Sequence, residues 1–74
     1  MDKVDDGESK KICGVIRSYC YGAGLNKQIL AKKVGMKYST LTWRMRNPET
    51  FKVGELITIY DFLNVPPEER LLII

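Results

Sequence analysis

The sequence contains no histidine, only two cysteines and no long hydrophobic run. Without histidine, the chain alone supplies neither a Ser-His-Asp triad nor a His-ligated zinc site. No apolar run approaches the roughly 18 residues of a membrane span, and the acidic N-terminus lacks the apolar core of a secretory signal. A glycine-rich phosphate-binding loop is also missing. We therefore expect neither an enzyme nor a membrane protein, and no cofactor or metal.

The two cysteines, Cys13 and Cys20, lie seven residues apart. On a helix this spacing separates them by roughly 10 Å of rise, which exceeds the about 7 Å between Cα atoms that a disulfide allows. A metal site would need more ligands than these two side chains. We expect both to be small buried residues in a protein of the reducing cytoplasm.

The net charge of +3 is unevenly distributed along the chain. Residues 11–52 hold nine basic side chains against Glu49 alone, which gives this middle segment a net charge of +8. The flanking residues 1–10 and 53–74 carry net charges of −2 and −3. A basic middle between two acidic ends indicates that one surface meets a polyanion. The alternative is a solvated charged surface without a partner.

Apolar residues recur at helical spacing in four segments, and no alternation typical of a strand is present. The predicted helices cover residues 9–21, 27–34, 38–46 and 54–63. Residues 49–52 are predicted to form a short loop with Phe51 as a buried plug, and Pro66-Pro67 has the character of a fresh helix start. The sequence therefore predicts an all-α fold of four to five short helices that follows a flexible acidic tail, residues 1–8.

Local signals define several of the predicted helix ends. Asn26 is a good N-cap for the second helix, and Ser39 or Thr40 is expected to cap the third. Asn47-Pro48 ends the third helix because a proline disfavours the helical conformation in the residue before it. Asn64 is expected in the left-handed conformation that closes the fourth helix.

The segment most informative about function is residues 26–47. Ala31 is small enough for the following helix to approach closely, and Gly35 permits a left-handed backbone at the corner. Leu41 and Met45 then pack the second helix of the pair down. Two helices joined by so tight a turn cross steeply, which is the helix-turn-helix arrangement. We therefore interpret residues 9–74 as one helix-turn-helix domain.

This segment resembles the helix-turn-helix of phage lambda repressor/Cro-like regulators, the Xre family. The family pattern is matched by Gln28 as the second residue of the first motif helix, by small Ala31 and by the turn glycine Gly35. Apolar residues follow directly and five residues later, as Met36 and Leu41 do. The resemblance covers roughly residues 9–66 and implies a lambda repressor-like DNA-binding bundle.

The chain departs from the family at two places. Arg44 stands where many members have a branched apolar residue, and Asn47-Pro48 stands where they have a glycine shortly after the recognition helix. Met45 is expected to take over the packing role at the first of these places. The exact rotation of the recognition helix depends on both departures.

The resemblance implies a sequence-specific, DNA-binding transcriptional regulator, a repressor of the phage type, whose residues 38–46 lie in the major groove. Phosphate contacts would fix the register, whereas base contacts would specify the sequence. The candidate base contacts are Gln28, Lys37, Tyr38, Ser39, Thr42 and Trp43. The candidate phosphate contacts are Lys27, Arg44, Arg46 and Lys52. The alternative for Tyr38 and Trp43 is partial burial, with the indole shielding the loop near Phe51.

The C-terminal residues Leu71, Leu72, Ile73 and Ile74 form an apolar segment that has two interpretations. It could cover the first helix, or it could form a homodimer patch, together with Phe62 of the fourth helix. We favour the dimer, which would place two recognition helices about 34 Å apart on a near-palindromic duplex site. The competing functional hypothesis is a protein-interaction module, such as an antirepressor, an antitoxin-like partner or an adaptor, that keeps the fold without binding DNA.

Overall fold

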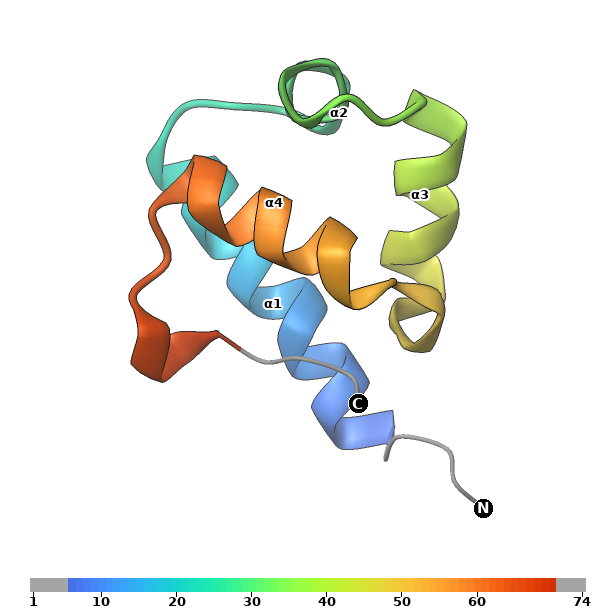
Figure 1. Cartoon of the computed structure of the whole chain (residues 1–74), viewed down its shortest axis with the longest axis vertical. Coiled ribbons are helices and arrows are strands. Elements are labelled where there is room, and N and C mark those ends of the chain that lie inside the picture. The colour runs from blue at the N-terminus through green and yellow to red at the C-terminus, as the bar shows by residue number, and fades with distance from the viewer. Residues whose placement is uncertain (1–5, 71–74) are drawn as a thin grey trace.

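Four α-helices and two single-turn 3₁₀ helices make up the part of the chain that the computed structural model describes, residues 6–70 (Figure 1). No strand occurs in this range, which confirms the predicted all-α fold. In Figure 1, α4 crosses α1, α2 lies above them and α3 stands at the right-hand edge of the molecule. The elements in chain order are α1 (Asp6–Gly22), α2 (Lys27–Val34), α3 (Tyr38–Arg46), η1 (Pro48–Thr50), α4 (Val53–Leu63) and η2 (Pro67–Glu69).

The helix bounds agree with the sequence pattern for α2 and α3 and differ from it elsewhere by a few residues. α2 and α3 begin and end where predicted, and α4 begins one residue early, at Val53. α1 begins at Asp6 instead of residue 9, because Gly7 costs a helix only about 1 kcal/mol and does not end it by itself. The 3₁₀ turn η1 begins at Pro48 and takes up the first half of the predicted loop 49–52, and the Pro66-Pro67 start yields only the single turn η2.

The N-terminal caps of α2 and α3 differ. The side chain of Asn26 accepts a hydrogen bond from the backbone N–H of Ile29 at 2.8 Å, which confirms the predicted cap of α2. The residue before α3, Lys37, makes no side-chain cap hydrogen bond. The prediction that Ser39 or Thr40 caps α3 is therefore wrong, because both residues lie inside the first turn and a capping residue precedes it.

The turn between α2 and α3 depends on a left-handed glycine. Gly35 has φ 76°, a value that only glycine adopts without a Cβ penalty. Its N–H donates to the carbonyl of Lys32 at 3.3 Å, and the N–H of Met36 donates to the carbonyl of Ala31 at 2.9 Å. This pair of bonds is a Schellman motif, which satisfies the last carbonyls of α2 and turns the chain at once toward α3.

The same device ends α4. Asn64 takes the predicted left-handed conformation with φ 59°, and its N–H donates to the carbonyl of Asp61 at 3.2 Å. The N–H of Val65 donates to the carbonyl of Tyr60 at 3.0 Å, and the Val65 side chain is buried. The chain thereby turns back toward α1 and continues into η2.

A single cluster of buried apolar side chains joins all four α-helices. It contains the predicted inner stripe of α4 and the predicted plug Phe51, and both cysteines are buried and free of disulfides. The Cys13 thiol donates to the carbonyl of Met45 at 3.3 Å, which links α1 to the end of α3. The cluster is formed by Ile12, Cys13, Ile16, Cys20, Leu30, Ala31, Leu41, Met45, Phe51, Leu56, Ile59, Tyr60, Leu63 and Val65.

Polar contacts tie η2 to α1, and tie Arg70, the residue after η2, to α4. The Tyr19 hydroxyl of α1 donates to Glu69 at 2.9 Å. Arg70 donates to Asp61 and to the carbonyl of Val65, both at 2.7 Å. The guanidinium of Arg70 is therefore already bound by groups of the protein itself. Among residues 6–70 there is no helix with the length and apolar character needed to cross a membrane.

Candidate nucleic-acid interface

The outer flank of α3 is a polar and aromatic surface. Leu41 and Met45 bury the inner side of the helix, as predicted. Ser39, Trp43 and Arg46 follow one another at i, i+4 and i+7, so they share one stripe of the helix, and all three are exposed. Because Trp43 lies about half a helical turn from the inner residues, its indole is 55% exposed.

Most of the predicted base-contacting residues lie on or near this flank. Tyr38 is 47% exposed, and Lys37 is exposed directly before the helix. Gln28 is exposed near the start of α2. Thr42 is different, because it is half-buried and its hydroxyl oxygen is buried without a hydrogen-bond partner among the described residues. In this conformation the hydroxyl of Thr42 is not accessible at the surface, so Thr42 is left out of the base contacts proposed below.

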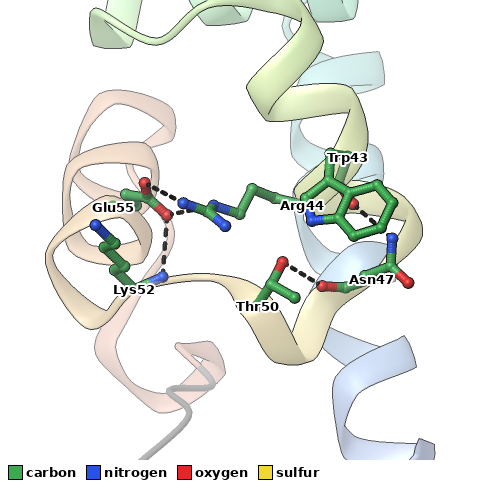
Figure 2. Close-up of polar contacts among 6 residues, drawn as sticks. All are labelled: Trp43, Arg44, Asn47, Thr50, Lys52 and Glu55. Atoms are coloured by element: carbon green, nitrogen blue, oxygen red, sulfur yellow. Dashed lines mark hydrogen bonds and ion pairs between the residues drawn. The ribbon is translucent and has the colours of Figure 1, made fainter.

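Arg44 points from α3 to the start of α4, as Figure 2 shows. Its Nε donates to Oε1 of Glu55 at 3.0 Å and its Nη2 donates to Oε2 at 3.3 Å, so the pair is bidentate. The Arg44 and Glu55 side chains are only 18% and 21% exposed. The pair ties α3 to α4, and a carboxylate already occupies the guanidinium that was predicted to contact a phosphate.

Glu55 also organises the first turn of α4. Its Oε1 accepts a hydrogen bond from the backbone N–H of Lys52 at 3.0 Å (Figure 2). A carboxylate at this place satisfies a backbone donor that the helix leaves free, and it interacts favourably with the helix dipole. Sequence reasoning missed Glu55, although an acid in the first turn of α4 and an arginine at an expected apolar position were the available signals.

The C-terminal end of α3 is closed by Asn47 in place of the expected glycine. The backbone N–H and the side-chain Nδ2 of Asn47 both donate to the carbonyl of Trp43, at 2.9 and 3.1 Å. The Thr50 hydroxyl donates to the carbonyl of Asn47 at 2.7 Å (Figure 2). Pro48 is buried at the start of η1. These contacts stop the helix one turn after Trp43 and hold the backbone that carries the indole.

Four of the predicted DNA-contacting cations are free of ion pairs with other described residues. Lys37, Arg46 and Lys52 are exposed, and Lys27 is half-buried at the start of α2. No ion pair between residues 10–70 involves any of them. An α-helix N-terminus and free cations both favour an anion. Lys37 directly before α3 and Arg46 at its last position therefore give this helix the positive charge that a polyanion requires.

The described residues show no sign of a metal centre, because no three of their Cys, Asp and Glu side chains are grouped so that they could hold an ion. Comparison of the chain with protein-family models, curated proteins and solved structures gives no match.

Proposed function

We propose that this protein is a sequence-specific DNA-binding transcriptional regulator with α3 as the recognition helix. The observation that carries the proposal is the exposed flank of α3, where Ser39, Trp43 and Arg46 form one stripe. A helix with one free flank fits the major groove, which is about 12 Å wide. The resemblance of residues 26–47 to lambda repressor/Cro-like, Xre-family regulators supports the same role.

The base contacts in this proposal come from α3 and the residue before it. Lys37 donates to guanine O6 or N7, and the Ser39 hydroxyl adapts to either a donor or an acceptor. The Trp43 ring contacts a thymine methyl group or a sugar, and Tyr38 reads an edge near the helix start. Gln28, near the start of α2, contacts a base or positions a neighbour that does.

The phosphate contacts come from Lys27, Arg46 and Lys52. Arg44 is omitted because Glu55 holds its guanidinium. Each neutralised phosphate contributes about −0.9 to the slope of log affinity against log salt, so three contacts give about −3 per monomer. The protein is proposed to bind a near-palindromic site as a dimer, and to act in the cytoplasm as a phage-type repressor.

The proposed dimer contact falls partly outside the described residues. The apolar segment 71–74 lies outside them. Phe62 of α4 is described, and it is exposed and available to a second copy. A symmetric dimer requires the same patch on both subunits. Sedimentation equilibrium of the protein and of the Phe62→Ala variant measures this contact. We expect the variant dimer to dissociate into monomers at a higher protein concentration than the parent dimer.

Selection of preferred duplexes from a random pool tests the function most directly. We expect a recurring motif with two half-sites about one helical turn apart. Fluorescence anisotropy on the selected duplex then measures affinity against salt. Arg46→Ala is expected to reduce the salt slope by about 1, whereas Lys11→Ala, an exposed lysine of α1 outside the proposed DNA contacts, serves as the control. No enrichment of any motif, or a flat salt response, would reject the proposal.

One observation favours a second candidate, a protein-interaction module. Two aromatic side chains, Tyr38 and Trp43, are exposed on α3, and such residues are enriched at protein–protein interfaces. The double variant Lys37→Ala, Arg46→Ala discriminates between the candidates in cells. Loss of regulation favours DNA binding, whereas full regulation by this variant together with its loss in Trp43→Ala favours the interaction module.

A further inference from the structure

An apolar pocket of about 280 Å³ opens beside the connection between α1 and α2. Its apolar lining comes from three helices and from the connecting turn. Ile16 and Cys20 belong to α1, Leu25 to the turn, Leu30 to α2 and Met45 to α3. Ile16, Leu30 and Met45 are core residues, so the pocket reaches the hydrophobic core. Small-molecule sites are concave and mostly apolar, with a few polar groups that fix orientation.

The turn that separates α1 from α2 shapes this pocket. Gly24 adopts a left-handed φ of 73°, and the N–H of Leu25 donates to the carbonyl of Cys20 at 2.9 Å. This bond holds Leu25 against the last turn of α1, where its side chain is half-buried. The opening is therefore bounded by hydrogen-bonded backbone, and a ligand would find it largely pre-formed.

Two cations, Arg17 and Lys27, also line the pocket. Arg17 is exposed on α1 and Lys27 is half-buried at the start of α2. Neither takes part in an ion pair with another of residues 10–70. No carboxylate side chain lines the pocket, so no negative charge in the lining balances these two cations.

We propose that this pocket binds a small monocarboxylate with an apolar body, of the kind represented by a short fatty acid. The body fills the apolar interior, which a free phosphate would leave empty. The carboxylate meets Arg17 and Lys27, and a guanidinium can accept a carboxylate in a bidentate arrangement. The pocket combines an apolar lining with two cations, and this combination is complementary to such a ligand.

Occupation of the pocket would also affect the proposed DNA interface. Lys27 is one of the three proposed phosphate contacts, so a carboxylate held there competes with a phosphate for the same ammonium group. This consequence rests on the proposed function, whereas binding of the carboxylate does not. A ligand that lowers DNA affinity in this way would act as an inducer.

Titration of the ¹⁵N-labelled protein with hexanoate, followed by NMR, tests the binding. We expect saturable shifts of the amides of Cys20, Leu25 and Leu30. Arg17→Ala and Lys27→Ala are expected to weaken binding at least about tenfold, and Lys32→Ala to leave it unchanged. The neutral analogue 1-hexanol should bind more weakly, and acetate should not saturate. The proposal is rejected by the absence of saturable shifts, by equal binding of hexanol, or by an equal loss in Lys32→Ala.

Alkylation of the cysteines gives a second measurement that needs no variant. Trypsin separates Cys13, in peptide 12–17, from Cys20, in peptide 18–27. Cys20 lines the pocket, whereas Cys13 does not and donates instead to Met45. Hexanoate should slow the reaction of Cys20 with iodoacetamide more than that of Cys13. Equal slowing of both cysteines, or of neither, contradicts a ligand in this pocket.

The regulatory consequence has its own assay. Anisotropy on the selected duplex should show a weaker apparent DNA affinity when hexanoate is present, and Arg17→Ala should reduce this effect. If no duplex is bound under any condition, the proposed function fails and the NMR result stands. If DNA is bound and the NMR shifts are absent, the pocket proposal fails alone.

Discussion

The ion pair between Arg44 and Glu55 allows the sharpest prediction about α3. We consider Arg44→Ala, Glu55→Ala and the double variant. The pair is bidentate at 3.0 and 3.3 Å, and about four-fifths of each side chain is buried. Exposed pairs contribute about 0–1 kcal/mol, and charge-assisted bidentate bonds contribute more. We expect Arg44→Ala to lower the free energy of unfolding by about 1–2 kcal/mol, with a coupling energy near 1 kcal/mol between the two sites.

Glu55→Ala should cost more than Arg44→Ala. Besides the ion pair, it removes the acceptor of the Lys52 N–H at 3.0 Å, and loss of such a capping contact costs about 0.5–1 kcal/mol more. Glu55→Gln keeps an oxygen for that N–H but removes the charge. Its free energy of unfolding should therefore lie between those of the parent and Glu55→Ala.

Urea unfolding followed by far-UV circular dichroism measures these values. For a chain of this length, each 1 kcal/mol corresponds to roughly 4–8 °C in melting temperature, which gives an independent check. Arg46→Ala is the matched control, since Arg46 lies on the same helix but is exposed and makes no ion pair with residues 10–70. Additive single variants within about 0.5 kcal/mol, or equal effects of Arg44→Ala and Arg46→Ala, would refute the reasoning.

The two arginines should separate again in DNA binding. Arg46→Ala should leave stability within about 0.5 kcal/mol and reduce the salt slope by about 1. Arg44→Ala should lower stability and leave the salt slope unchanged, because its charge is already balanced by Glu55. A reduced slope in Arg44→Ala would mean that its guanidinium leaves Glu55 for a phosphate when DNA is bound.

Further predictions concern caps, the turn and pH. Asn26→Ala should lower the free energy of unfolding by about 1 kcal/mol in urea, because the Ile29 N–H loses its acceptor. Gly35→Ala should cost about 1–2 kcal/mol at a φ of 76°, with Gly35→Asn costing less; equal stabilities would contradict the strain. A hydrogen bond to Glu69 raises the pKa of Tyr19 above 10.0, and burial raises the pKa of Cys20 above 9.0. Both shifts favour the protonated folded state, so stability should be constant at neutral pH and fall as pH rises through the raised values; a profile that stays flat while both groups lose their protons would contradict this.

The bounds of α2 and α3 could be predicted because their signals are local. Asn26 marks the start of α2 and Gly35 its end, and Asn47-Pro48 stops α3. The start of α1 lacked such a signal, because Gly7 weakens a helix without ending it. The error in the predicted cap of α3 has the opposite cause: Ser39 is a capping residue by type, but the chain already becomes helical at Tyr38.

The contacts of α3 with its neighbours could not be predicted from helical spacing. Spacing separates an inner side from an outer side, but Arg44 and Thr42 lie between the two. The direction of Arg44 depends on where α4 places Glu55, eleven residues later in the chain. The pocket was missed for the same reason, since the turns of α1 and α2 and the end of α3 meet only in the folded chain.

The presence of Arg44 rather than an apolar side chain at this position has a consequence for the rotation of α3. An apolar contact tolerates sliding and rotation, because dispersion depends weakly on direction. A bidentate pair fixes both distance and orientation. With Arg44 held by Glu55 on one side and the backbone end held by Asn47, α3 has little freedom to turn about its axis. The same constraint keeps Trp43 on the outer flank. Under the proposed function, the Arg44–Glu55 pair would therefore determine which side chains of α3 face the DNA groove without contacting DNA itself.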